Sequence, residues 1–503
     1  MELSAAIRAV IATFRDRPDE LLPWYLLGLA APGIARIFMF AGFLGLYLYY
    51  QTTGRLAELR AELVAIDWEF PDPESDPDAF VEWIEGLEPI VEILVTPTSV
   101  GLLLISLGLT VLALFVLAAM MEAAQMATSF ARLRQEPGIR AGIGGLRDHW
   151  VAFLALYLLE GLLWFVVTAG AIALVGAIAM VSLGLAVLVG VVVFFLWVAT
   201  VVVIRGLFVF APVSIIVDEA SVLGSLRASG RFIRRELMSA VGYFAVSIGL
   251  IIGFGSLTST AAPFGGAALG ALAGATLLGP ALHLLKTVLY GEYREAVEPP
   301  KSPERGLLEQ VRAGMGRGLT ELKSFVVTTP GLHGLSTAVL LGGFAAGWLI
   351  AEPFLGLVEL PIRDRLVGVI PPLFAIEIFG NNWTVMITTA YAGIFVGIPA
   401  IVSLIWNGVA LGFVGRLEPE PEVLMAFVIP HGILEVPVLI VSGALGLYLG
   451  LSTWRTWRGQ RGRVELAEDL KRAFWVLIGV GILVAVAAFV EGFISPYYWR
   501  LFL

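Results

Sequence analysis

Two ionisable residues lie four positions apart in an otherwise apolar stretch near the C-terminal end of the chain. His431 and Glu435, in the segment IPHGILEVP, would share one face of a helix. A third ionisable residue, Glu491, lies in the last apolar stretch. An acid at the middle of a membrane span costs about 2.5 kcal/mol or more and is usually retained for function. The residue types are therefore compatible with the handling of a proton or a ligand.

Three asparagines add hydrogen-bonding groups to the same part of the chain. We expect the six side chains to form one intramembrane polar cluster: Asn381, Asn382, Asn407, His431, Glu435 and Glu491. Two simpler readings stay open. The histidine and its neighbouring glutamate could bond only to each other, and the asparagines could serve as hydrogen bonds between helices. We expect no metal, because one histidine with two glutamates is a small ligand set, and we expect no cofactor.

The elements that hold these residues must be membrane helices. Of the 503 residues, 58% are hydrophobic and only 15% are charged, and the mean hydropathy is +0.89. Several apolar runs reach the roughly 20 residues that a helix needs to cross a bilayer. The chain has no cysteine, which excludes disulfides, thiol catalysis and thiolate metal sites. It has only four histidines. The fold class is therefore all-α, a polytopic helical membrane protein.

Charge distribution predicts the orientation of the helices. The segment 51–98 holds twelve acidic residues and two arginines, whereas the arginines elsewhere gather in several other polar segments. Basic loops favour the cytoplasmic side. We therefore expect a cytoplasmic N-terminus and an acidic loop outside the cell, with one helix over 56–68 and another over 78–94. We also read no removable signal peptide at the N-terminus.

We predict about eleven membrane spans, six in the first half and five in the second, with the C-terminus outside. A continuous helix from Pro372 to Arg416 would be about 65 Å long, roughly twice the hydrocarbon thickness, so we place a break at Gly397-Ile-Pro399. A very tight turn near Met180 separates two long apolar runs. The expected spans lie near 22–50, 99–127, 150–174, 181–206, 239–258, 266–290, 335–356, 373–396, 399–415, 424–452 and 473–495.

The same reading gives a domain organisation. Residues 1–298 form a six-span membrane domain that includes the acidic loop. Residues 299–330, with Pro299, Pro300 and Pro303, form a cytoplasmic, partly helical linker. Residues 331–503 form a five-span domain that carries the six predicted site residues. In the first domain Glu160 stands alone in an apolar run, and we expect it to be protonated and hydrogen-bonded.

The second domain, over about 335–496, resembles the stage II sporulation protein M family. The resemblance rests on residues in matching order and spacing: Phe379-Gly-Asn-Asn382, Gly393, Gly397, Asn407-Gly408, Gly412, Pro430-His-Gly-Ile-Leu-Glu435, Pro437, Glu491 and Ser495-Pro496. Val436 stands where leucine is expected. The resemblance implies an integral membrane protein. Members in spore formers are similar to a membrane partner of peptidoglycan-remodelling enzymes during engulfment.

The first domain resembles six-span membrane domains related to the membrane portion of some glycerophosphodiester phosphodiesterases. The residues that carry this resemblance are Ala211-Pro212, Val217-Asp-Glu219 and Ser225-Leu-Arg-Ala-Ser229. It implies amphipathic "elbow" helices at the cytoplasmic surface, one of them over 142–149. Nothing in this half supplies the catalytic carboxylates of a phosphodiesterase, so we do not expect that activity. A basic cluster in the other elbow would suit anionic lipid head groups, although a solvated face explains it equally well: Arg227, Arg231, Arg234 and Arg235.

Two classes of function follow. The first is a non-enzymatic membrane scaffold that recruits membrane or cell-envelope proteins and is compatible with a homo-oligomer. The second is a transporter, channel or lipid-handling permease with an outward-facing polar site, since broken spans often mark binding sites. An enzyme is not expected, because no catalytic constellation is visible. We expect a multi-pass protein of the plasma membrane, in contact with the lipid bilayer and with no nucleic-acid partner.

Overall fold

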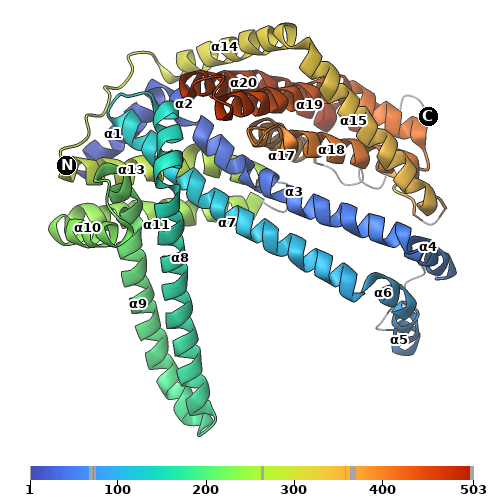
Figure 1. Ribbon diagram of the computed structural model, residues 1–503, viewed down its shortest axis with the longest axis horizontal. Coiled ribbons are helices and arrows are strands. Elements are labelled where there is room, and N and C mark those ends of the chain that lie inside the picture. Colours follow the sequence, from blue (N-terminus) through green and yellow to red (C-terminus); the bar gives the residue numbers. More distant parts are fainter. Residues whose placement is uncertain are drawn as a thin grey trace. The chain divides into compact units, whose positions relative to one another are not determined.

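The computed structural model describes residues 2–66, 72, 75–261, 266–356, 358–362 and 370–498 (Figure 1). Over these residues the chain forms helices and no strand, so the all-α class is confirmed. The first half contains α1 (Leu3–Asp16), α2 (Pro18–Leu21), α3 (Pro23–Thr52), α4 (Arg55–Ala65), α5 (Pro77–Glu85), α6 (Glu88–Leu94), α7 (Pro97–Leu133), α8 (Gly138–Ala179), α9 (Leu183–Val217), α10 (Val222–Arg235), α11 (Leu237–Ala261), α12 (Gly266–Ala273) and α13 (Gly279–Tyr293). A π-helical turn, Gly274–Leu278, joins α12 to α13.

The second half is also helical where it is described. It contains α14 (Leu307–Thr328), α15 (Pro330–Ala351), a 3₁₀ turn (Glu352–Phe354), α17 (Pro371–Ala392), α18 (Ile398–Leu417), α19 (Pro421–Trp457), α20 (Arg463–Phe493) and α21 (Ser495–Tyr498). Helix α14 makes most of the predicted linker helical. The chain breaks between α17 and α18 where Gly397 adopts a φ of 78°, which glycine accepts without steric cost. The predicted break at this position is confirmed.

Ten of the described helical segments are long and apolar enough to cross a membrane, so the chain is a multi-pass helical membrane protein. Six of them lie in the first half, as predicted, and four in the second. The remaining predicted span of the second half, near 373–396, corresponds to α17. This helix has 22 residues but is not among the ten. The count of eleven spans and the orientation of the chain stay predictions.

The helices form two compact units that alternate along the chain. The first unit comprises Met1–Leu29, Phe115–Leu319 and Thr456–Ile478, and the second comprises Ala30–Leu114, Thr320–Arg455 and Gly479–Leu503. The borders of the units fall within helices, among them α3, α7 and α20. The two units therefore differ from the predicted domains 1–298, 299–330 and 331–503. Each predicted domain is continuous in sequence, whereas each unit combines three separate segments.

Three buried aromatic side chains from three helices lie in the hydrophobic core of the first unit. Phe210 of α9, Phe232 of α10 and Tyr290 of α13 are almost fully buried, and the ring centroids of Phe210 and Phe232 lie 4.7 Å apart. The loop after α9 is fastened to this core by Asp218, which accepts hydrogen bonds from Tyr290 and Arg294. The hydrogen bond to the carboxylate raises the pKa of the Arg294 guanidinium.

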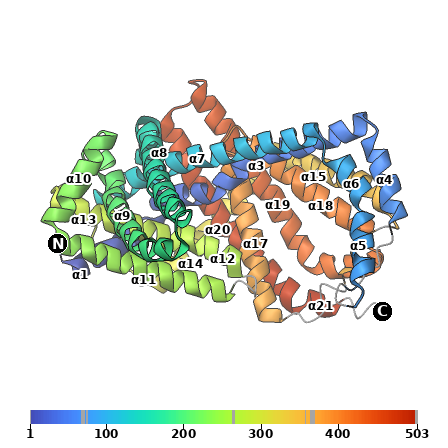
Figure 2. The same ribbon diagram turned by 90° about the horizontal axis from the view of Figure 1, so that it is seen from below.

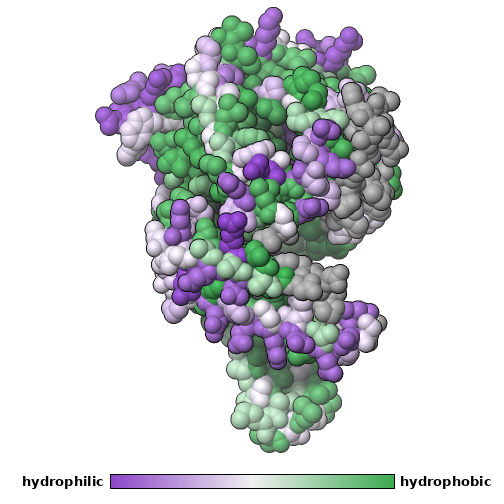
Figure 3. Space-filling view, turned by 90° about the vertical axis from the view of Figure 1, so that its right-hand side faces the viewer, coloured by the Kyte–Doolittle hydropathy of each residue, from purple (hydrophilic) through white to green (hydrophobic). Residues whose placement is uncertain are grey.

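Helices α8 and α9 of the first unit lie side by side as a long hairpin (Figure 1). The turn at its tip is tight, as predicted, and Ser182 accepts a hydrogen bond from the Leu185 amide there. The side chains of Met180 and Val181 at the tip are 90% and 84% exposed. Figure 3 shows apolar side chains gathered over the tip at the bottom of the view. Such an apolar surface belongs in lipid rather than water.

The predicted elbow at 142–149 is wrong. These residues are a continuous part of α8, which begins at Gly138. Gly142 and Gly145 lie so close to Trp24, Thr128 and Ala127 that a Cβ atom on either would overlap a neighbour. This close packing keeps the segment in line with the rest of α8, and no proline interrupts it.

The acidic loop folds into three short helices within the second unit. Helix α4 agrees with the helix predicted over 56–68 as far as Ala65, and residues 67 and 68 lie outside the described residues. The helix predicted over 78–94 divides into α5 and α6 at Gly86 and Leu87. The side chain of Arg55 in α4 donates to the Ile93 carbonyl of α6, so these helices form a small folded element.

The second unit is held together by close backbone contacts at glycines. Helices α15 and α18 lie side by side (Figures 1 and 2). Gly343 and Gly347 of α15 face Gly408 and Gly412 of α18, and a Cβ at any of the four would fall on the backbone of the other helix. Both helices thus carry the Gly-x-x-x-Gly spacing that lets membrane helices approach closely.

Candidate polar site in the C-terminal region

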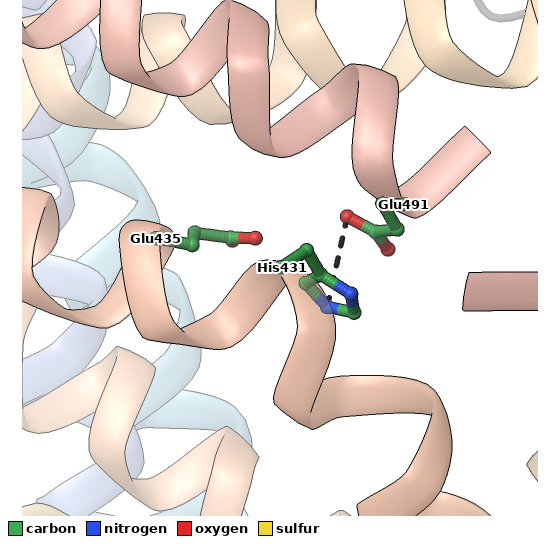
Figure 4. Close-up of side chains that lie close together, drawn as sticks. All are labelled: His431, Glu435 and Glu491. Atoms are coloured by element: carbon green, nitrogen blue, oxygen red, sulfur yellow. Dashed lines mark ion pairs between the residues drawn. The ribbon is translucent and has the colours of Figure 1, made fainter. Parts of the chain in front are cut away.

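Helix α19 positions two of the predicted site residues. It contains Pro430 and Pro437 within its length, and each proline removes one helical hydrogen bond and disturbs the turn before it. His431 follows the first proline directly, and Glu435 lies one turn further on. The two side chains share one face of α19 (Figure 4), as their spacing predicts.

The C-terminal end of α20 supplies the third ionisable group. Glu491 points toward His431 in Figure 4, and the distance from His431 Nε2 to Glu491 Oε2 is 3.8 Å. The other ring nitrogen, His431 Nδ1, lies 3.0 Å from Ser495 Oγ in a hydrogen bond. Ser495 begins α21 and is fully buried. The imidazole therefore connects α19 to the end of α20 and the start of α21.

Helix α17 completes the site through its asparagines. Asn382 Nδ2 donates a hydrogen bond of 2.8 Å to Glu435 Oε1, and Asn381 Nδ2 donates to Asn382 Oδ1 over 3.3 Å. Asn381 itself is exposed, whereas Asn382 is partly buried. We call the group formed by Asn382, His431, Glu435, Glu491 and Ser495 the polar cluster. It joins α17, α19, α20 and α21.

The polar cluster is shielded from solvent. His431 is 5% exposed, the side chain of Glu491 is 14% exposed, and the Phe427 ring stands edge-on to the imidazole with the centroids 5.3 Å apart. Two carboxylates in so enclosed a place require a compensating proton, cation or set of hydrogen bonds. Asn382 supplies one such bond to Glu435, and His431 lies beside Glu491.

Three of these groups could together hold a metal ion. One ligand atom each from His431, Glu435 and Glu491 lies within 4.8 Å of the other two. One nitrogen and two carboxylate oxygens suit a divalent ion such as Mn²⁺ or Zn²⁺, with water or a neighbouring oxygen completing its coordination. The geometry thus offers a candidate ligand set of one histidine and two glutamates, and the expected absence of a metal stays a prediction.

Asn407 lies apart from the polar cluster in its bonding. Its Nδ2 atom donates to the Ser403 carbonyl of its own helix over 2.8 Å, and Ser403 Oγ bonds to Thr389 Oγ1 of α17 over 2.6 Å. The structure therefore brings together four of the six predicted residues: Asn382, His431, Glu435 and Glu491. Asn381 bonds to this group through Asn382, whereas Asn407 bonds to a carbonyl of its own helix. Ser495 was missed as a site residue, although the Ser495-Pro496 pair had been noted next to Glu491.

In the first unit, Glu160 is hydrogen-bonded, as expected, but it is not alone. It accepts a hydrogen bond of 3.0 Å from Arg205 and forms an ion pair with it. Arg205 follows Glu160 by 45 positions, and the α8–α9 hairpin brings the two residues together.

Among the basic residues of α10, Arg227, Arg231 and Arg234 line a cavity and Arg235 does not.

Comparisons with known proteins agree with the resemblance of the second half. The model of the family described as Stage II sporulation protein M matches residues 336–496. An uncharacterized protein of Methanocaldococcus jannaschii is 25% identical over 124 residues, which cover 24% of this chain and 70% of that protein. No solved structure matches the chain. The resemblance of the first half to phosphodiesterase-related membrane domains gains no support from these matches.

The family match includes every residue of the polar cluster. It also includes the glycines through which α15 and α18 make contact. This C-terminal third of a multi-pass helical membrane protein is therefore similar to the stage II sporulation protein M family.

Proposed function

We propose that the protein is a non-enzymatic scaffold in the plasma membrane, whose C-terminal region holds a fixed arrangement of helices for membrane or cell-envelope partners. The observation that carries this proposal is the polar cluster, whose side chains bond to one another across α17, α19 and α20–α21. Interhelical hydrogen bonds of this kind stabilise one arrangement of membrane helices. The glycine contacts between α15 and α18 support the same reading, because backbones in contact have little freedom to slide.

Isolation of the protein from native membranes tests this function. A scaffold should retain a defined membrane or envelope protein at a constant stoichiometry after mild solubilisation. The Gly347→Leu variant, which forces α15 away from α18, should lose that partner. The Gly342→Leu variant is the matched control, since a Cβ at Gly342 has no atom within 4 Å, and it should retain the partner. A wild-type protein that retains no partner under conditions that preserve its fold would contradict the proposal.

A second function, cation-coupled transport, is favoured by one observation: the ligand atoms of His431, Glu435 and Glu491 lie within 4.8 Å of one another. Titration of purified protein with Mn²⁺ and Zn²⁺ by calorimetry tests it. Stoichiometric binding that weakens at least about tenfold in Glu491→Gln, but not in Glu377→Gln, would favour transport over a scaffold. Glu377 is an exposed residue of α17 and serves as the control. The scaffold proposal predicts no difference between the two variants.

A further inference from the structure

A cavity of about 1650 Å³ lies within the first unit. Its walls come mainly from α9, α10, α11 and α13, with contributions from α7 and α8. Helix α10 connects the end of α9 to the start of α11, and both of these helices are candidate membrane spans. A helix that links two spans lies at a membrane face, so the cavity begins at this face where α10 borders it.

Three arginines of α10 line this part of the cavity. Arg227, Arg231 and Arg234 are spaced by four and three positions, which puts them on one face of the helix. All three side chains are exposed. Within the described part of the chain, neither Arg227 nor Arg231 has a carboxylate partner, and Arg234 Nε donates to the Gly230 carbonyl of its own helix over 3.2 Å.

The acidic residues of the cavity are already paired with other cations. Lys286 Nζ donates to Glu122 over 3.2 Å, and His283 Nε2 lies 3.4 Å from the same carboxylate. Glu160 pairs with Arg205. The cavity thus has five basic side chains against two carboxylates, with His283 counted as neutral, and the excess positive charge is that of the three α10 arginines. This surface is complementary to an anion from outside the chain.

Apart from these ion pairs, the walls are mostly apolar and extend along the spans. Ile248 and Ile251 of α11 line the cavity, and the latter lies 14 positions beyond Leu237 at the start of that helix. At 1.5 Å per residue this is about 21 Å, well into a hydrocarbon layer of about 30 Å. Val202 and Val203 of α9 also line the cavity. An occupant must therefore be anionic at one end and apolar along its length.

We propose that this cavity binds an anionic phospholipid, with the phosphate at Arg227, Arg231 and Arg234 and the acyl chains along α9 and α11. The proposal is independent of the scaffold function of the C-terminal region, because every residue in it belongs to the first unit. The bound lipid would fill the apolar part of the cavity and would neutralise the α10 arginines.

Native mass spectrometry of the full chain tests the proposal. The protein is released from nanodiscs of phosphatidylcholine that contain a minor share of phosphatidylglycerol, and the retained lipids are counted. Wild-type protein should retain phosphatidylglycerol in preference to phosphatidylcholine. The Arg227→Gln/Arg231→Gln variant should lose this preference by about tenfold or more. Arg235→Gln removes a charge from the same helix outside the cavity and should leave the preference unchanged.

Two results would overturn the lipid site. One is equal retention of phosphatidylglycerol by the double variant and wild type, with native helicity and elution volume showing that both are folded. The other is a loss of equal size in Arg235→Gln, which would point to a general effect of surface charge. Inorganic phosphate and glycerol phosphate serve as soluble competitors. The proposal predicts that neither displaces the lipid, whereas displacement by either would show a phosphate site without a role for acyl chains.

Discussion

At the scale of single residues, the polar cluster shows how the chain keeps ionisable groups inside a membrane region. Each of its two carboxylates has a neighbour that offsets the cost of burial: Asn382 for Glu435, and His431 for Glu491. Ser495 fixes the other nitrogen of the imidazole, which orients the ring toward the glutamate. The arrangement depends on contacts between helices rather than on the spacing of His431 and Glu435 alone.

Neighbouring asparagines give a matched test of this arrangement. Asn382→Ala removes the hydrogen bond to Glu435 and should lower the free energy of unfolding in bilayers by about 1 kcal/mol, within the range for interhelical bonds in membranes. Asn381→Ala removes an exposed side chain whose bond is to Asn382, and should cost less. Reversible unfolding in lipid bicelles measures both. Equal losses would show that the bond to Glu435 contributes nothing specific.

At the scale of helices, glycines account for one correct and one wrong prediction from the sequence. The break between α17 and α18 was predictable, because Gly397 and Pro399 mark it in the sequence. The course of α8 through 142–149 was not, because the contacts of Gly142 and Gly145 with Trp24 and Ala127 are tertiary. No proline follows Gly142 or Gly145 within α8, and the sequence does not show which helix either glycine faces.

The same limit applied to the candidate site. The spacing of His431 and Glu435 put them on one helix face, and the structure agrees (Figure 4). The rotation of α18 about its axis could not be read from an apolar run, so Asn407 was grouped with residues that it does not bond. The hydrogen bond between Ser495 and His431 could not be expected from the sequence, because it joins residues 64 positions apart.

Adjacent glycines of α15 allow a sharp test of helix packing. Gly343→Ala places a methyl group against the backbone of α18 at Ile405 and should destabilise the protein by about 1–3 kcal/mol, as overpacking does elsewhere. Gly342→Ala meets open space and should be neutral or stabilising, because alanine favours a helix by up to about 1 kcal/mol over glycine. Thermal unfolding in lipid nanodiscs distinguishes the two. Destabilisation by both substitutions to the same degree would contradict the described contact.

At the scale of the whole molecule, the C-terminal region contributes helices to both compact units. The start of α20 belongs to the first unit, where Asp19 of α2 accepts a hydrogen bond from Trp475 over 3.2 Å and lies 3.3 Å from Lys471 Nζ. Arg317 of α14 lies 3.5 Å from the same carboxylate and stacks on the Trp475 ring. This network, centred on the buried Asp19, links residues more than 450 positions apart in the chain.

We predict that the two halves of the chain associate through this network. Fragments 1–329 and 330–503, produced together as separate chains, should copurify. Asp19→Ala should reduce their association by on the order of 2 kcal/mol, between the values for exposed and buried ion pairs, since Arg317 and Lys471 are partly exposed. Glu468→Ala, which breaks an exposed pair with Arg140, is the control and should have little effect. Unchanged copurification of the Asp19→Ala fragments would contradict a structural role for the network.

The central claim is that the helices around the polar cluster keep one arrangement. The chain lacks cysteine, so spin labels can be attached at Glu377→Cys on α17 and Phe489→Cys on α20, two exposed positions of the second unit. Double electron–electron resonance in nanodiscs then gives the distance between the labels. It is measured with and without Zn²⁺, which is diamagnetic and therefore used instead of Mn²⁺, and at pH values on either side of neutrality. A scaffold predicts a single narrow distribution under all conditions. A second distance whose share changes with pH or Zn²⁺ would show alternating arrangements and contradict the scaffold in favour of transport.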